Sequence, residues 1–416
     1  MTRTLPKSAF GFALFFGLFY IEPISVGPTT IAVLWKTFLM LGLIIVLINR
    51  HLVVGMNKLT AWGLLFVLST VLNESLFLNP VETISFAIKN AIIPVLYAFL
   101  LYRAGKSDRG IDRNTSFLIL LSLFIALSVL PFLTGLVSPL SSGYDLSLFN
   151  DLAGGVFGFI GIFQNAHGAS ITLAVAIGTI IWSLPYTRTT GKKYFHIALI
   201  IIGAAALVLT LVRTGAAMLA VMIFFVLITS RKRIHLSLAV GFAIIAIGAG
   251  IYLFETNDAF RMRLLGENIY TVQQTVTLNQ IGSGRLLYWT SALENFFSAP
   301  FLVQIFGFGP TLAKDYMQQA TGLRIYAHNG FIDILQFYGY FGIFAYGMML
   351  LRIFRIVFAL KRANPYFLLG WMHTFAYLSQ MAVQGERFFL ADLLFALVLV
   401  SVTVARPSNH TQRPVC

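Results

Sequence analysis

The chain of 416 residues is 58% hydrophobic and only 11% charged, and its mean hydropathy is +0.83. A soluble domain carries about 25% charged residues, so this composition excludes a soluble fold and predicts an all-α polytopic membrane protein. The net charge of +14 does not indicate a nucleic-acid partner, because the basic residues form no stripe with interleaved aromatic residues.

Apolar runs long enough for membrane-spanning helices recur along the whole chain. At about 20 residues per helix they predict about twelve spans, roughly at 9–26, 29–49, 60–78, 84–102, 115–137, 167–185, 194–212, 214–230, 235–254, 340–360, 365–384 and 388–405. Most of the 29 Lys and Arg residues fall in the even-numbered loops, in the tails or at the helix ends facing them. Cytoplasmic loops are enriched in these residues, so both termini are expected on the cytoplasmic side.

Two of the predicted external segments are long, about 138–166 and 255–339. The second is large enough to form a helical cap between spans nine and ten. An amphipathic helix within it is expected to begin near Leu286 and to close before Pro300, because proline cannot continue a helix. No repeat or low-complexity tract divides the sequence. We therefore expect one membrane domain over 1–416, with an external cap at 255–339.

Arg213 lies between two apolar runs, within Leu-Thr-Leu-Val-Arg-Thr-Gly at 209–215. The predicted topology places it in a tight external turn. An arginine that snorkels to the membrane interface is one interpretation. The other is a fixed guanidinium facing the external side, where its planar fork suits a phosphate or diphosphate.

Arg285 follows Gly282-Ser283-Gly284 and begins the helix predicted in the cap. Glycines allow a backbone to approach a ligand closely, and a helix N-terminus attracts anions. A flexible loop leading into a surface helix is the alternative interpretation.

His328 and Asn329 precede an apolar periodic run that starts at Phe331. Asn329 is expected to be the N-cap of a helix, which explains the asparagine but not the histidine. Histidine is the side chain best suited to move protons near neutral pH. We therefore consider His328 a candidate base for a hydroxyl nucleophile.

Arg324 and Arg387 are weaker candidates for substrate binding, since each could instead neutralise a neighbouring carboxylate. Signatures of other enzyme classes are missing from the sequence: there is no Gly-Lys-Ser/Thr phosphate loop, no His-Glu-x-x-His and no Cys/His metal cluster. These absences disfavour a cofactor and an ATP- or metal-driven enzyme. Positive side chains would then stabilise a diphosphate leaving group in place of a metal.

Taken together, the motifs resemble the O-antigen polymerase and ligase superfamily of bacterial inner-membrane glycosyltransferases. The matching pieces are Leu-Thr-Leu-Val-Arg-Thr-Gly at 209–215, Gly-Ser-Gly-Arg with Tyr-Trp at 282–289, Ala-Pro-Phe and Phe-Gly-Phe-Gly within 299–309, and Ala-His-Asn-Gly-Phe-Ile-Asp-Ile-Leu at 327–335. The resemblance extends from about 155 to 345. One departure is Val212, where many relatives have serine.

The resemblance implies a GT-C-like membrane fold and metal-independent transfer of a glycan from undecaprenyl diphosphate on the periplasmic side. By position, it implies that Arg213 and Arg285 hold the diphosphate and that His328 lies near the acceptor hydroxyl. Arg324, Arg387 and Asn329 would contribute to substrate binding.

Two acceptors are compatible with these motifs. A polymerase would extend another lipid-linked repeat unit, and a ligase would transfer the glycan to lipid A–core. The single His-Asn after Tyr-Ala favours the polymerase. A multi-span transporter or flippase would also explain the number of spans, but it would leave the cap with its His and Arg residues unexplained, and no paired halves are evident.

Overall fold

The computed structural model describes residues 25–26, 29–30, 57–80, 82–84, 86–87, 90–91, 94–95, 166–187, 189–210, 212–229, 233–256, 285–360 and 365–384. Within these residues the protein is helical apart from two short strands, β1 (Ser25–Val26) and β2 (Thr29–Thr30), which pair antiparallel. The all-α prediction missed this pair. Gly27 and Pro28, which separate the strands in the sequence, are residue types typical of turns.

The predicted spans between 167 and 254 and those at 340–360 and 365–384 are confirmed as helices. They are α8 (Ala166–Ser183) with the 3-10 turn η3 (Leu184–Tyr186), α9 (Thr190–Leu209), α10 (Arg213–Thr229), α11 (Arg233–Thr256), α16 (Gly330–Ala359) and α17 (Pro365–Val383). Among the described residues, three segments are long and apolar enough to cross a membrane: His167–Tyr186, Thr190–Val208 and Gly330–Ala359.

The predicted span at 60–78 is broken into three pieces: α3 (Asn57–Leu68), the 3-10 turn η1 (Ser69–Leu72) and α4 (Ser75–Leu78). The hydroxyls of Ser69 and Thr70 donate to backbone carbonyls three residues earlier, a local bond that competes with regular helix. Asn73 is then extended and its Nδ2 donates to the carbonyl of Phe337 at 2.6 Å. This long-range bond was not visible in the hydropathy pattern.

The other predicted spans lie partly or wholly outside the described residues. Scattered positions of the span at 84–102 are helical, and only the strand residues of 9–26 and 29–49 are described. The spans at 115–137 and 388–405 lie outside the described residues.

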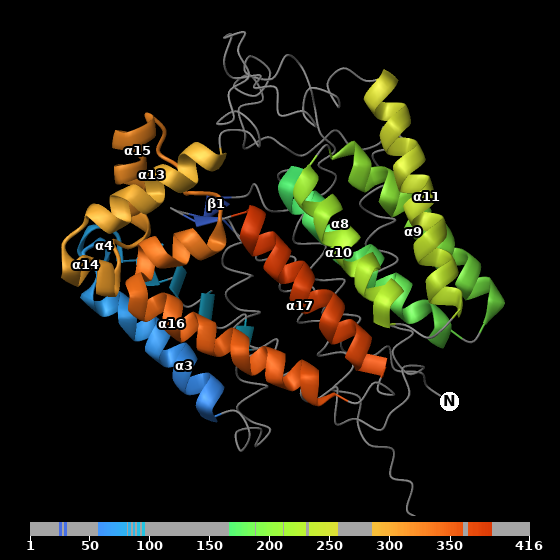
Figure 1. Ribbon diagram of the computed structural model, residues 1–416, viewed down its shortest axis with the longest axis horizontal. Coiled ribbons are helices and arrows are strands. Elements are labelled where there is room, and N and C mark those ends of the chain that lie inside the picture. The colour runs from blue at the N-terminus through green and yellow to red at the C-terminus, as the bar shows by residue number, and fades with distance from the viewer. Residues whose placement is uncertain are drawn as a thin grey trace, which may run out of the picture.

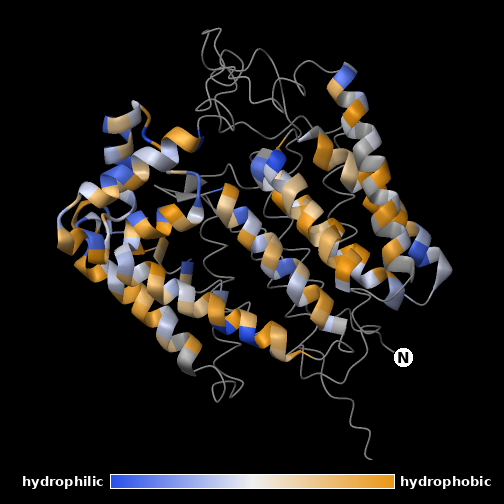
Figure 2. Cartoon of the chain, viewed as in Figure 1, coloured by the Kyte–Doolittle hydropathy of each residue, from blue (hydrophilic) through white to orange (hydrophobic). Residues whose placement is uncertain are grey.

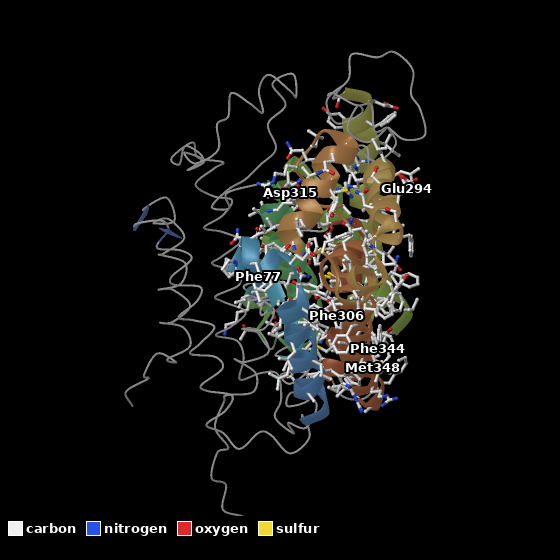
Figure 3. The ribbon with its side chains drawn as sticks, turned by 90° about the vertical axis from the view of Figure 1, so that its left-hand side faces the viewer. Phe77, Glu294, Phe306, Asp315, Phe344 and Met348 are labelled. Carbon is white, nitrogen blue, oxygen red and sulfur yellow. The ribbon has the colours of Figure 1, made fainter. Side chains whose placement is uncertain are left out.

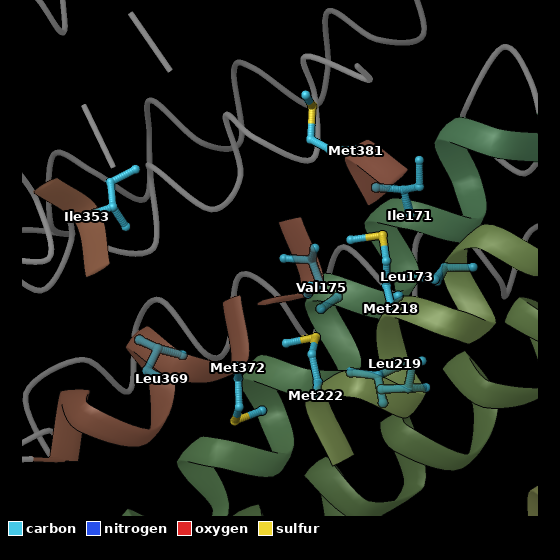
Figure 4. Close-up of a cluster of buried hydrophobic side chains, with 14 of the residues drawn as sticks. Ile171, Leu173, Val175, Met218, Leu219, Met222, Ile353, Leu369, Met372 and Met381 are labelled. Atoms are coloured by element: carbon cyan, nitrogen blue, oxygen red, sulfur yellow. The ribbon is translucent and has the colours of Figure 1, made fainter. Parts of the chain in front are cut away.

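Two groups of helices carry the core (Figure 1). In one group α10 packs most extensively on α17 and α8; in the other α16 packs on α3 and on α14 (Phe301–Phe306), and α16 also contacts α17. Methionines fill the first group: Figure 4 shows Met222 of α10 close to Val175 of α8 and Met372 of α17. Met222 lies directly against Gly178, where a Cβ would be 2.2 Å from its Cε. Flexible thioethers thus fill the space left by a glycine on the facing helix.

The helix predicted in the cap is confirmed as α13 (Arg285–Ser298), and it ends before Pro300. α14 and α15 (Pro310–Thr321) follow. α13 packs on α15 and α16, and α15 also contacts α4.

α16 is kinked at Gly339, whose φ of 65° and ψ of −165° interrupt the helix. A kink leaves carbonyls of the preceding turn without helical partners. Here the carbonyls of Gln336 and Phe337 accept from the N–H groups of Phe308 and Gly309, at 2.7 and 3.1 Å. The loop after α14 therefore binds to the carbonyls exposed at the kink. The kink also separates the first turns of α16 from the remainder of the helix.

Polar and apolar residues are segregated along the molecule. Figure 2 shows long helices that are mainly hydrophobic and more hydrophilic residues on α13 and α15. In Figure 3 the labelled acidic residues Glu294 and Asp315 lie toward one end, and Phe344 and Met348 of α16 lie toward the other.

Candidate active site

Several helix termini meet at the end of α17. Asn329, which precedes α16, donates through Nδ2 to the carbonyl of Ala382 at 3.0 Å. Thr214, in the first turn of α10, donates to Gln384 Oε1 at 3.5 Å. The start of α10 and the start of α16 are therefore both attached to the C-terminal end of α17.

Arg213 is the first residue of α10, and its guanidinium-bearing side chain is exposed. Its backbone position is fixed by the close approach of α10 to α8. A Cβ on Gly215 would lie 2.4 Å from the carbonyl oxygen of Ser170, so only glycine allows this contact. Before the helix, the N–H of Val212 donates to the Thr210 hydroxyl at 3.2 Å.

Arg285 is the first residue of α13 and is half-buried. Burial, and then the positive charge of Arg213, lower the pKa of the Arg285 guanidinium. The two arginines are thus close enough to repel each other, although they come from distant parts of the sequence. One turn along α13, the ring of Tyr288 lies 6.2 Å from the imidazole of His328, centroid to centroid.

His328 has a left-handed backbone, with φ of 56°. A non-glycine residue in this region costs about 1–3 kcal/mol and persists only where its surroundings hold it. Both neighbours of His328 are fixed: the N–H of Ala327 donates to Asp333 Oδ1 at 3.0 Å, and Asn329 is bonded to Ala382. The backbone from which the imidazole projects is thereby held by the fold.

Burial, and then the charge of Arg285, lower the pKa of His328 to about 4. The imidazole is therefore neutral near pH 7, the form that can accept a proton from a hydroxyl group. An anion bound at Arg285 would offset the charge of that arginine. Binding of an anion would consequently raise the pKa of His328 and make it a stronger base.

The arrangement favours an anionic ligand. α10, α13 and α16 all begin here, and helix N-termini carry partial positive charge that attracts phosphate groups. Within the described residues, no carboxylate forms an ion pair with Arg285. Nor does this part of the chain contain a group of three or more His, Cys, Asp or Glu residues placed to hold a metal ion.

The structure brings Arg213, Arg285 and His328 together, while the three residues predicted to bind substrate have different surroundings. Asn329 is the N-cap of α16, as predicted: its Oδ1 accepts from the N–H groups of Phe331 and Ile332 at 3.0 and 3.3 Å. Arg324 is exposed and pairs with Asp315 at 2.8 Å, the alternative considered for it above. Arg387 lies outside the described residues.

Sequence reasoning did not single out Tyr288 or Asp333 as site residues. Tyr288 is three residues after Arg285, a spacing that places two side chains on one face of a helix, so the predicted helix could have indicated it. Asp333 is buried and in the first turn of α16, where a carboxylate is favoured by the helix dipole. Its bond to Ala327 depends on the tertiary fold and leaves no trace in the spacing.

The family model described as O-Antigen ligase matches residues 197–347, which include Arg213, Arg285 and His328. This part of the chain is therefore similar to the O-antigen polymerase and ligase superfamily. The resemblance predicted from the motifs is thus confirmed over this segment. A search of curated proteins finds no match to the chain. This match associates residues 197–347 with O-antigen or polysaccharide biosynthesis of the ligase and polymerase type.

Proposed function

We propose that this protein transfers a glycan from undecaprenyl diphosphate to a sugar hydroxyl of an acceptor. The observation that carries the proposal is geometric: the starts of α10 and α16 are both bonded to the end of α17, and Tyr288 of α13 lies against His328. Arg213, Arg285 and His328 lie at these helix starts, and the lowered pKa values of Arg285 and His328 agree with their proximity. Two cations next to a neutral histidine provide a binding place for a diphosphate and a base beside it.

In the proposed reaction, His328 accepts the proton of the acceptor hydroxyl as its oxygen attacks the anomeric carbon of the donor glycan. The new glycosidic C–O bond forms while the bond from the anomeric carbon to the diphosphate oxygen breaks. The electron pair leaves with undecaprenyl diphosphate. Arg213 and Arg285 stabilise the charge that develops on this leaving group, which is where fixed positive groups contribute most to catalysis.

The remaining predicted substrate contacts are part of the same proposal. Asn329 acts by fixing the start of α16, since its amide is already used as an N-cap and as a donor to Ala382. Arg324 and Arg387 are proposed to contact the glycan or its acceptor; for Arg324 this requires exchange of its exposed pair with Asp315, and exposed pairs contribute little stability.

The proposed orientation has this site on the periplasmic side of a bacterial inner membrane. Two of the described helices near the site carry basic residues away from it: Lys192 and Lys193 near the start of α9, and Arg352 and Arg355 in the C-terminal half of α16. Basic residues favour the cytoplasmic side. We propose one membrane domain over 1–416 of about twelve spans, GT-C-like in fold, with 255–339 as its periplasmic cap.

We propose a polymerase, because the motif Tyr-Ala-His-Asn at 326–329 favours it, and keep a ligase as the second candidate, because the matched family is described as O-Antigen ligase. Reconstitution of the purified protein with an undecaprenyl-diphosphate glycan tests both. A longer lipid-linked glycan supports the polymerase, and glycan on supplied lipid A–core supports the ligase. If the wild-type protein changes neither acceptor, the enzyme proposal fails.

A further inference from the structure

Glu82 is the centre of a polar network that joins three parts of the chain. Its Oε1 accepts from Lys314 Nζ and, at 3.1 Å, from the Tyr326 hydroxyl. Its Oε2 accepts from the Thr311 hydroxyl at 2.9 Å and from Asn79 Nδ2 at 3.2 Å. One carboxylate thereby connects the segment after α4 with α15 and with the loop that leads to α16.

The network is largely enclosed by protein, since the side chains of Glu82 and Lys314 are each only 19% exposed. Burial acts to raise the pKa of Glu82, but hydrogen bonds from Lys314, Thr311 and Tyr326 and the charge of Lys314 outweigh it and lower the pKa. The carboxylate is therefore ionised, and its bonds are of the stronger, charge-assisted kind. Lys314 also lies over the Tyr326 ring, 5.0 Å from its centroid, so Tyr326 is held at its hydroxyl and at its face.

Tyr326 is two residues before His328. The loop between them is fixed at Ala327 by Asp333 and at Asn329 by Ala382, and the Tyr326 hydroxyl supplies the anchor on the N-terminal side. Because His328 has a left-handed backbone, it depends on such anchors to keep its orientation.

We propose that Glu82 is a positioning residue for His328, acting through its hydrogen bond to the Tyr326 hydroxyl. This inference rests on the proposed function of His328 as the base. Glu82 lies outside the segment 197–347 that matches the family, so the N-terminal part of the chain contributes to the site. Glu82 itself is proposed to touch neither donor nor acceptor.

The expected kinetic effect is on turnover. Displacement of a catalytic group by about 1 Å can reduce the rate about 100-fold. Tyr326→Phe removes only the hydroxyl anchor and leaves Glu82 bonded to Lys314 and Thr311. We expect it to lower kcat about 10-fold or more with KM changed less than about 2-fold, since the substrate contacts are intact. Glu82→Gln should have a larger effect, because it also removes the charge that pairs with Lys314.

The test uses the full-length protein in liposomes with an undecaprenyl-diphosphate glycan, together with NMR titration of labelled histidine. The variants are Tyr326→Phe, Glu82→Gln and their double mutant, and His328→Gln assigns the signal. The matched control is Glu294→Gln, which makes the same chemical change at an exposed carboxylate of α13.

If Glu82 positions His328 through Tyr326, loss of the Tyr326 hydroxyl releases the imidazole from its buried setting. The pKa of His328 should then be at least one unit higher in Tyr326→Phe than in the wild type. Glu294→Gln should leave the pKa of His328 unchanged. The positioning role also predicts a double mutant no slower than Glu82→Gln alone, as expected for groups in one network. Wild-type titration and wild-type kcat in Tyr326→Phe would overturn the inference. If the wild type forms no product, the proposed function fails, while the titration still decides whether Glu82 and Tyr326 hold His328.

Discussion

Gly215 lies two residues after Arg213, where α10 closely approaches the backbone of α8. A Cβ there would be 2.4 Å from the Ser170 carbonyl oxygen and 2.6 Å from its carbon, whereas ordinary van der Waals contact begins at 3.4 Å. Both atoms are backbone, so Gly215→Ala can be accommodated only if the helices separate by about 1 Å. Overpacking of this kind costs typically about 1–3 kcal/mol, and a shift of about 1 Å in a catalytic group can cost about 100-fold in rate.

The assay for Gly215→Ala is kcat with a lipid-linked donor together with the thermal unfolding midpoint in detergent. Gly248→Ala in α11 is the control, because a Cβ there has no neighbour within 4 Å and alanine favours helix by up to about 1 kcal/mol. We expect lower kcat and a lower midpoint for Gly215→Ala only. Wild-type values for both quantities would refute the close approach of α8 and α10 and the fixed position of Arg213.

Three further outcomes are expected. Gly309→Ala should lower the unfolding midpoint more than Gly322→Ala does. Both glycines have positive φ, but only at Gly309 would a Cβ clash, because it would lie 2.1 Å from Asn73 Oδ1. Equal effects of the two substitutions on the midpoint would contradict this packing. The pKa of His328 in the folded protein, about 4, lies below the usual value of about 6.5. The neutral imidazole therefore makes its full contribution to the free energy of unfolding above about pH 6.5, and this contribution is lost as the pH falls toward 4. His328→Gln should therefore flatten the dependence of the unfolding midpoint on pH, and an unchanged dependence would argue against the buried neutral imidazole. Arg285→Lys should reduce kcat about 10-fold or more, since lysine lacks the planar fork that binds a diphosphate in two places; full activity would show that a single charge is sufficient.

Much of the local structure could be predicted from the sequence because it depends on neighbouring residues. Pro300 ends α13 and Asn329 caps α16 as expected, and the turn before Arg213 separates two apolar helices. These features follow from backbone chemistry and from hydropathy over short windows.

The features missed by the sequence analysis depend on contacts between distant residues. The break of the predicted span at 60–78 is stabilised by Asn73, which bonds to Phe337, and the kink of α16 is occupied by the loop at Gly307–Gly309. Glu82 likewise gains its role only from Lys314, Thr311 and Tyr326. Apolar periodicity carries no information about such partners.

Within the site, the two arginines could be identified from the sequence, but their proximity could not. The sequence identified Arg213 and Arg285 as unusual charges next to apolar or glycine-rich segments, because charges are costly near a membrane. Their proximity to each other and to His328 required the fold, which bonds the starts of α10 and α16 to the end of α17 and places Tyr288 of α13 against His328.

We propose that His328 is the base for glycan transfer at a site formed with Arg285 and Arg213. The most direct measurement is a single-turnover reaction of purified His328→Ala in liposomes containing an undecaprenyl-diphosphate glycan and acceptor, with equal amounts of folded wild-type protein in parallel. General bases contribute about 100- to 10,000-fold, so we expect product formation to fall by at least about 100-fold. A rate within about 3-fold of the wild type, well short of that range, would contradict it.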